Sequence, residues 1–198
     1  MLQLLNGPAD LAEFDALEAR LGHALPDDFK ASYLLHDSSH LVSGLILGLP
    51  LMPLAEIGHQ WQGWADIAGD EETVADLSED CQSHPPGAVK PLYANRGWVP
   101  FAGDAMNFVA LDFDPGPAGR VGKVINAGRD NDIRHVIATD FTRFLEIVAE
   151  EFRANRVVLN TGEPTHSPRW LALPGGKRDL LTGLRTLLGL SRTPEPGL

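Results

Sequence analysis

Apolar residues recur every three or four positions near the start of the chain, which is the spacing of a helix that buries one face. The stripe consists of Leu11, Phe14, Leu17 and Leu21, and Gly22 follows it where a helix C-cap is expected. The pattern predicts a first amphipathic helix.

A second helix is predicted to begin after Pro26, because proline is tolerated at a first helical position. Phe29 and Tyr33 follow one turn apart, and we expect this helix to end near residues 37–39. The next stretch, Leu41–Leu49, is apolar and punctuated by glycine. It predicts one strand or a pair of short strands.

The third predicted helix opens at Pro53, and its apolar stripe contains Leu54, Ile57, Trp61 and Trp64. Two tryptophans on one stripe are more typical of a hydrophobic core than of a ligand platform. A final helix is predicted where Thr139 and Asp140 can cap its start. The apolar stripe of that helix consists of Phe141, Phe144, Leu145, Val148 and Phe152.

Between the third and the final helix the pattern changes to short apolar runs separated by turn residues, which is typical of strands. The predicted strands are Val89–Tyr93, Trp98–Phe101, Phe108–Phe113, Val121–Ile125 and Ile133–Ala138. Helices therefore come first and last, with most strands between them. This order predicts an α+β fold with a mostly antiparallel central sheet flanked by N-terminal and C-terminal helices.

Asp112 and Asp114 are two residues apart and would point to the same face if the strand continued through both. Paired carboxylates can act as a general acid or hold a metal. An aspartate before Pro115-Gly116 can instead cap its own turn by accepting a hydrogen bond from the amide two residues on. We expect turn capping for Asp114, and for Asp112 both interpretations are open.

The chain has 198 residues, enough for one domain with a sizeable core and an appended segment. Signals for a core end near Phe152, so we expect a domain over residues 1–154 and a linker with a basic amphipathic segment over residues 155–198. The leucine stripe and positive charge of that segment favour packing back on the domain over binding a partner or touching a membrane surface.

Cys81 is the only cysteine, which excludes an internal disulfide and gives no support for a thiolate zinc site. His36 and His40 have the spacing of a zinc-binding helix, but residues 37–39 between them lack the required glutamate and indicate a turn. We see no signal peptide and no apolar run near the roughly 20 residues of a membrane span. We therefore expect a cytoplasmic protein without cofactor, metal or membrane span.

The net charge of −11 is unevenly distributed, because residues 153–198 carry seven basic and three acidic side chains and residues 1–152 carry −15. Such an acidic body repels phosphate backbones and attracts basic proteins, which argues against direct nucleic-acid binding. Its stretch Asp66–Asp80 has few apolar anchors and is predicted to be a solvated face or a mobile loop. The candidate partner-binding residues there are Asp70, Glu71, Glu72, Asp76, Glu79 and Asp80. The alternative is that these charges serve solubility alone.

Residues 10–152 contain an ordered series of short motifs. They are Leu25-Pro26-Asp27-Asp28-Phe29, Tyr33 with His36-Asp37, Leu51-Met52-Pro53-Leu54 with Trp61, Trp98-Val99-Pro100-Phe101 with Asp104, Leu111-Asp112-Phe113-Asp114-Pro115, and Gly119 to Ile125. The series resembles the SUKH superfamily, which comprises bacterial polymorphic-toxin immunity proteins and fungal cell-wall-assembly regulators. The resemblance implies a sheet flanked by helices, and protein binding rather than catalysis. Its structural motif would comprise Trp61, Trp98, Pro100, Phe101, Asp104, Asp112, Asp114, Pro115, Gly119 and Gly122.

The functional hypothesis that this resemblance favours is a cytoplasmic immunity-type protein that binds and neutralises a toxin domain. The acidic body supports a basic toxin as the partner. The alternative is a non-catalytic protein-interaction or regulatory module, for example in cell-envelope assembly. An enzyme that uses Asp112 and Asp114 is the weakest hypothesis, and the sequence does not predict the oligomeric state.

Overall fold

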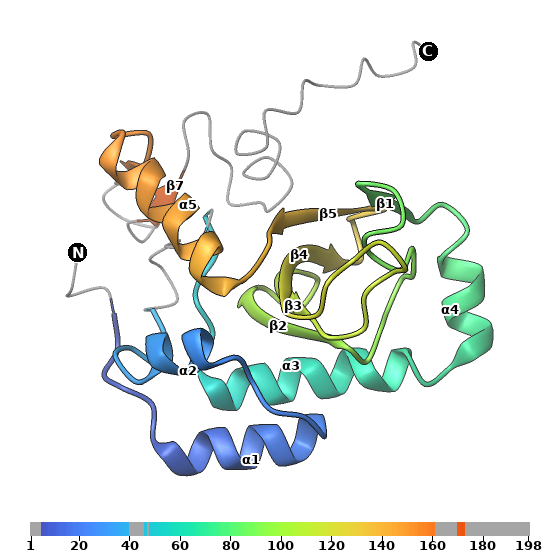
Figure 1. The fold of residues 1–198 in the computed structure, drawn as a ribbon, viewed down its shortest axis with the longest axis horizontal. Coiled ribbons are helices and arrows are strands. Elements are labelled where there is room, and N and C mark those ends of the chain that lie inside the picture. Colours follow the sequence, from blue (N-terminus) through green and yellow to red (C-terminus); the bar gives the residue numbers. More distant parts are fainter. Residues whose placement is uncertain (1–4, 40–45, 47, 161–169, 173–198) are drawn as a thin grey trace, which may run out of the picture.

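The structure is a computed structural model that describes residues 5–39, 46, 48–160 and 170–172. In these ranges the chain forms five helices and a five-stranded sheet with the strand order β1-β5-β4-β3-β2 (Figure 1). The predicted α+β fold with a mostly antiparallel sheet is confirmed. The helices are α1 (Leu11–Leu21), α2 (Asp27–Tyr33), α3 (Leu54–Ile67), α4 (Glu71–Leu77) and α5 (Phe141–Arg153). The strands of the sheet are β1 (Gln82–His84), β2 (Trp98–Gly103), β3 (Asn107–Asp112), β4 (Lys123–Gly128) and β5 (Ile133–Ala138).

Local capping explains where α1 begins and ends. The carboxylate of Asp10 accepts a hydrogen bond from the amide of Ala12 at 3.0 Å, and the carboxylate of Glu13 accepts one from the amide of Asp10 at 2.9 Å, so together they form a capping box. Gly22 closes the helix in the left-handed conformation, with φ of 79°. The predicted first helix is therefore confirmed.

α2 ends at Tyr33, earlier than predicted. The amides of Leu35 and His36 close a turn on the carbonyl of Ser32, and from Asp37 on the chain bonds to partners outside α2. The amide of Asp37 bonds to the carbonyl of Gly7, and its carboxylate accepts the amide of Leu54 at 2.9 Å. That second bond caps the first turn of α3, whose own N-cap, Pro53, makes no side-chain cap. The predicted strand region Leu41–Leu49 lies largely outside the described residues.

β3 lies in the middle of the antiparallel part of the sheet, between β2 and β4. Phe108 and Ala110 face one apolar cluster with Trp98, while Val109 and Leu111 face a second cluster formed with the helices. Burial on both faces explains why this strand is an unbroken apolar run rather than an alternating one.

The outer edge of β2 is covered by the segment Pro50–Met52. The amide of Met52 donates to the carbonyl of Phe101 at 2.8 Å, and the amide of Gly103 donates to the carbonyl of Pro50 at 3.2 Å. The last part of this strand is therefore paired on both sides.

The predicted strand Val89–Tyr93 is wrong: this segment is a loop. Its amides are satisfied by side chains instead of a ladder, since the amide of Val89 bonds to Oγ of Ser83 at 3.0 Å and that of Tyr93 to Oγ of Ser78 at 2.8 Å. The edge strand next to β5 is instead β1, which the sequence did not indicate. It pairs with β5 in parallel.

Aromatic rings join the two ends of the domain. Phe29 of α2 lies 4.9 Å from Phe141 of α5, measured between ring centroids, and Phe101 of β2 lies 5.3 Å from both Phe141 and Phe144. Edge contacts of this kind add to the burial of apolar area. The final helix, predicted from its apolar stripe and its Asp140 cap, is confirmed and closes the core over β4 and β5 (Figure 1).

After α5 the described chain contains one further antiparallel pair, β6 (Val158–Asn160) with β7 (Trp170–Ala172). Residues 161–169 and 173–198 lie outside the described residues, so most of the predicted linker and basic segment is not described. Within the described ranges, no helix has the length and apolarity needed to cross a membrane.

Candidate functional site

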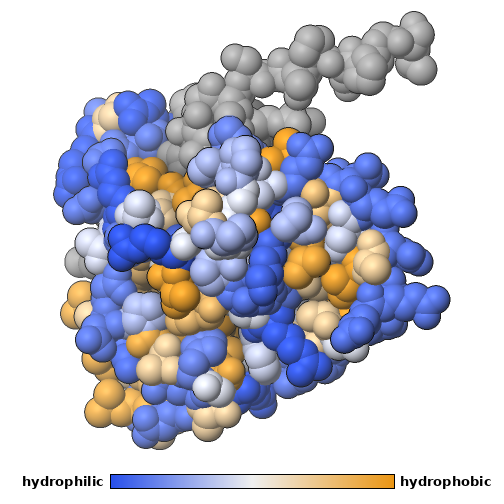
Figure 2. All heavy atoms as spheres, turned by 45° about the vertical axis from the view of Figure 1, so that its right-hand side comes forward, coloured by the Kyte–Doolittle hydropathy of each residue, from blue (hydrophilic) through white to orange (hydrophobic). Residues whose placement is uncertain are grey.

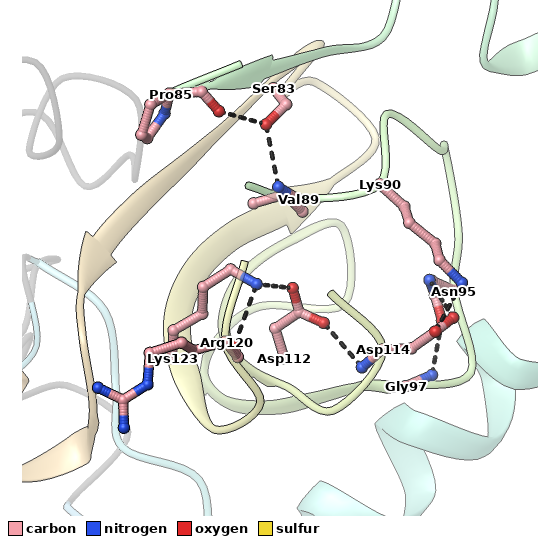
Figure 3. A network of polar contacts seen from close by, with 10 residues as sticks. All are labelled: Ser83, Pro85, Val89, Lys90, Asn95, Gly97, Asp112, Asp114, Arg120 and Lys123. Carbon is pink, nitrogen blue, oxygen red and sulfur yellow. Dashed lines mark hydrogen bonds and ion pairs between the residues drawn. The ribbon is translucent and has the colours of Figure 1, made fainter. Parts of the chain in front are cut away.

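The carboxylate of Asp112 is buried and fully occupied. Nζ of Lys123 lies 2.5 Å from Oδ2 of Asp112, and both side chains are almost completely buried. Oδ1 of Asp112 accepts the amide of Asp114 at 3.0 Å (Figure 3). Asp112 therefore caps the turn that follows β3.

Asp114 has a different role from the turn cap that we expected. Its carboxylate binds Nζ of Lys90 at 2.6 Å and Nδ2 of Asn95 at 3.0 Å (Figure 3). The amide two residues on, that of Gly116, bonds to the carbonyl of Ala88. Because β3 ends at Asp112, the first carboxylate and not the second stands at the start of the turn. Asp114 instead ties the turn to the loop that precedes β2.

The surroundings of the two carboxylates shift their pKa values in opposite directions. Burial raises the pKa of Asp112, and the hydrogen bond and charge of Lys123 oppose that effect only in part. Burial also acts to raise the pKa of Asp114, but hydrogen bonds from Lys90 and Asn95 outweigh it and lower the pKa. A carboxylate enclosed with its own lysine cannot work with a neighbour on a substrate, so this geometry does not support the hypothesis of a catalytic pair.

Glycines allow the turn after β3 to pack against the backbone of the loop before β2. A Cβ at Gly119 would lie 2.1 Å from the carbonyl oxygen of Ala88, and one at Gly116 would lie 2.3 Å from that of Gly87. Gly122 has φ of 83° and donates its amide to the carbonyl of Asp112 at 2.8 Å. This close approach is structural, because it brings backbone against backbone.

Five further residues of the proposed structural motif are also held by the fold, and Pro115 is half-buried in the turn after β3. Trp98, Pro100 and Phe101 are buried in β2. Nε1 of Trp61 donates to the carbonyl of Arg96 at 2.8 Å, and Asp104 accepts the amides of the two residues that complete the β2–β3 turn.

The six acidic residues that we singled out lie on and beside α4. All are exposed, and no residue within α4 itself is buried. Asp70 caps the helix by accepting the hydroxyl of Thr73 at 2.7 Å and its amide at 3.1 Å, and the hydroxyl bond is the main cause of the lowered pKa of Asp70. The stretch is thus a helical solvated face rather than a loop, because its acidic first turn and its cap favour a helix. Figure 2 brings this side of the molecule forward and shows it to be mostly hydrophilic with small apolar patches between.

Sequence reasoning missed Arg134, which is 1% exposed in β5. Its guanidinium donates to the carbonyls of Leu92 and Tyr93 at 3.0 and 3.2 Å and lies over Trp98, 5.5 Å from the ring centroid. It fixes the loop that replaces the expected strand. A charged residue inside an apolar strand was the one available signal.

Sequence reasoning also missed a groove along α3. Two cavities of about 820 and 450 Å³ lie on either side of the β2–β3 turn, and Gln60 and Ala105 line both. One wall of this α3 groove is a stripe of the helix: Pro53, Glu56, Gln60, Gly63 and Ile67. The other wall includes the turn residues Gly103, Asp104, Ala105 and Met106.

Comparison with known proteins gives a consistent set of matches. The model of the SMI1 / KNR4 family (SUKH-1) matches residues 8–147. The chain is 38% identical over 158 residues to the "Cell wall biosynthesis/cell cycle regulator smi1" of Schizosaccharomyces pombe, covering 74% of this chain and 31% of that protein. It is 29% identical over 183 residues to the "Cell wall assembly regulator SMI1" of Saccharomyces cerevisiae, covering 76% of this chain and 36% of that protein. It is 28% identical over 179 residues to the "Glucan synthesis regulatory protein" of Neurospora crassa, covering 73% of this chain and 33% of that protein. The match thus spans about a third of the length of each of these relatives.

Proposed function

The chain belongs to the SMI1/KNR4 family (SUKH-1), and from this premise we propose that it is a non-catalytic protein-interaction module with a regulatory role. The names of its relatives support a role in building the cell wall or envelope. Because the match covers only part of each relative, the process that this chain regulates is itself part of the proposal. Its single cysteine fits the cytoplasm, which we propose as its location.

The observation that carries the proposal is the acidic surface of α4. A helix without a buried residue contributes little to the core, yet this one concentrates carboxylates on an exposed face. Asp112 and Asp114, by contrast, form ion pairs with Lys123 and Lys90 that hold the fold together. The surface that remains for function suits recognition of a basic protein.

Electrostatic attraction of this kind acts mainly on association. It raises association rates by about 10 to 10³ at low salt and is screened beyond about 8 Å at physiological ionic strength. Salt should therefore slow the binding of the partner more than it speeds its release.

The test begins with a partner captured by cross-linking to the full chain in cells and then purified. A variant with Glu72→Gln, Asp76→Asn and Asp80→Asn removes three charges of the α4 face and leaves the Asp70 cap intact. The matched control, Asp15→Asn, Asp27→Asn and Glu146→Gln, removes three exposed charges from α1, α2 and α5. Stopped-flow kinetics should show slower association for the first variant only, with the difference shrinking as salt rises. Equal association rates for both variants at low salt would remove the acidic face from the proposal.

A second candidate is the immunity-type role, which the acidic surface also favours because domains that act on nucleic acid are basic. The relatives compared above are named as regulators, so the comparisons support the regulatory role better. Co-expression decides between the two. If a gene next to that of this chain is toxic alone and tolerated with the chain, the immunity role gains; if no neighbouring gene is toxic, the immunity role is dropped.

A further inference from the structure

The α3 groove follows the length of a helix. Its helical wall uses residues spaced by three and four positions, which form one face of α3. α3 has 14 residues, so this face is about 20 Å long. Gln60 and Ala105 line both cavities, so the two lie next to each other along this face of α3, with the β2–β3 turn opposite.

The lining of the α3 groove offers apolar contact. The larger cavity is lined by Leu51 and Met52, and the smaller by Ile67, Tyr93 and Met106. Met106 keeps 44% of its surface exposed at the tip of the turn. An exposed methionine beside an apolar depression is suited to side chains of varied shape.

The rim of the α3 groove is acidic. Glu56, Asp66 and Asp104 contribute carboxylates, while the one arginine among the described lining residues, Arg129, is paired with Asp130 at 3.1 Å. At the C-terminal end of α3 the chain continues into the acidic face of α4. An occupant with positive charge along its flanks is therefore complementary.

We propose that the α3 groove binds an amphipathic helix of a protein partner, with its apolar face in the groove and Lys or Arg side chains along the rim. Helices pack side by side at axial distances of 8–10 Å, and a helix laid in a groove is a common mode of peptide recognition. The inference rests on the proposed function, because it gives the interaction module a second contact that is separate from the α4 face.

The chain offers a way to fill the groove without disturbing the fold. A Cβ at Gly63 meets no heavy atom within 4 Å, and Gly63 lies in α3 without a positive φ. Gly63→Phe should therefore place a ring in the groove of a folded protein. Ala105→Phe adds a ring at a residue that lines both cavities. Ala19→Phe, on an exposed position of α1, is the matched control.

The probe is a fluorescein-labelled 18-residue peptide of leucine and lysine, with leucines at helical spacing on one face. A peptide with glutamate in place of lysine and a scrambled leucine–lysine peptide serve as references. Fluorescence anisotropy should show saturable binding of the first peptide to the full chain. The glutamate and scrambled peptides should bind at least tenfold more weakly. Gly63→Phe and Ala105→Phe should each weaken binding at least tenfold, and Ala19→Phe should leave it unchanged.

Several outcomes would overturn the inference. One is no binding of the helical peptide, or equal binding of its scrambled form. Another is equal affinity of Gly63→Phe and the unmodified chain, with thermal unfolding confirming that both are folded. If Gly63→Phe abolishes self-association of the chain, the groove belongs to a second copy. If removal of residues 173–198 tightens peptide binding tenfold, the groove belongs to the chain's own basic segment.

The two proposals can fail separately. Neutralising the α4 face should change the salt dependence of association with the captured partner, whereas Gly63→Phe should mainly speed dissociation. If the partner binds the α4 variant normally but does not bind Gly63→Phe, the groove proposal stands and the α4 proposal fails. With the reverse result, the α4 proposal stands and the groove proposal fails.

Discussion

The carboxylate of Asp28 in α2 accepts both the amide and the hydroxyl of Thr142 in α5, each at 2.9 Å and across 114 positions of the chain. The bond to the amide satisfies a donor in the first turn of α5, so one helix caps another. Asp28→Ala and Thr142→Val should each destabilise the fold. In a double-mutant cycle measured by urea unfolding, the two changes should couple by about 0.5–1.5 kcal/mol. Strict additivity would show that the hydroxyl bond contributes nothing.

The buried pair of Asp112 and Lys123 predicts an asymmetry between single and double replacements. Asp112→Asn keeps an acceptor for the amide of Asp114 but leaves a buried lysine without its counter-charge, which should cost about 3–5 kcal/mol. Adding Lys123→Met removes that charge and should restore much of the lost stability. Urea unfolding of the unmodified chain and of these two variants tests this, and a double variant no more stable than Asp112→Asn would contradict it.

Gly119 and Gly63 predict opposite responses to the same change. Gly119→Ala places a methyl group 2.1 Å from a backbone oxygen and should cost about 1–3 kcal/mol or more. Gly63→Ala meets open space in a helix and should stabilise by up to about 1 kcal/mol. Thermal and urea unfolding measure both, and a neutral Gly119→Ala would mean that the close approach is not required.

Asp140 predicts a pH-dependent term in stability. The amide of Arg143 and then the hydroxyl of Thr139 lower the pKa of Asp140, so its folded pKa lies below the unfolded value. Its contribution is therefore present above the unfolded pKa of about 3.9 and is lost as pH falls through the lowered folded pKa. Asp140→Asn keeps an acceptor but does not titrate. The free energy of unfolding of the unmodified chain, relative to this variant, should thus decline between about pH 5 and pH 2, and a constant difference would remove Asp140 as a source.

A chain shortened before Thr161 should still unfold cooperatively. The aromatic contacts that join α5 to α2 and β2 are complete by Phe144, and the family match ends at residue 147. The shortened chain loses β7, the partner of β6, so local loosening near Val158 is expected. Broad, non-cooperative thermal unfolding would show that the segment beyond Thr161 belongs to the core.

The elements that the sequence predicts well are those fixed by neighbouring residues. The structure confirms several such local signals: the Gly22 cap of α1, the Asp140 cap of α5 and the apolar run of β3. In the predicted stripe of α1, Phe14, Leu17 and Leu21 are buried and Leu11 is exposed. The sequence predicted the wrong role for Asp114 and left that of Asp112 open, because the cross-strand register puts Lys123 opposite Asp112 and the fold brings Lys90 to Asp114. Spacing along the chain does not report such a pairing.

Long-range contacts account for the other differences. Val89–Tyr93 has strand-like composition, but Ser78, Ser83 and Arg134 provide its hydrogen-bond partners. The α3 groove exists only because the β2–β3 turn stands opposite one face of a helix. Neither arrangement can be derived from a window of neighbouring residues.

The two borders of the sheet bear on how crowded copies of this chain behave. Along β2, Pro50–Met52 already occupies the outer hydrogen-bonding positions near Phe101, and Pro100 has no amide to donate. At the opposite border, β1 is three residues long and is followed at once by Pro85-Pro86. Over the described part of the chain, the borders of the central sheet therefore offer few free backbone hydrogen-bonding positions to a strand of another molecule. A newly made molecule should resist templated fibre growth through this sheet, and recognition is left to its side-chain surfaces.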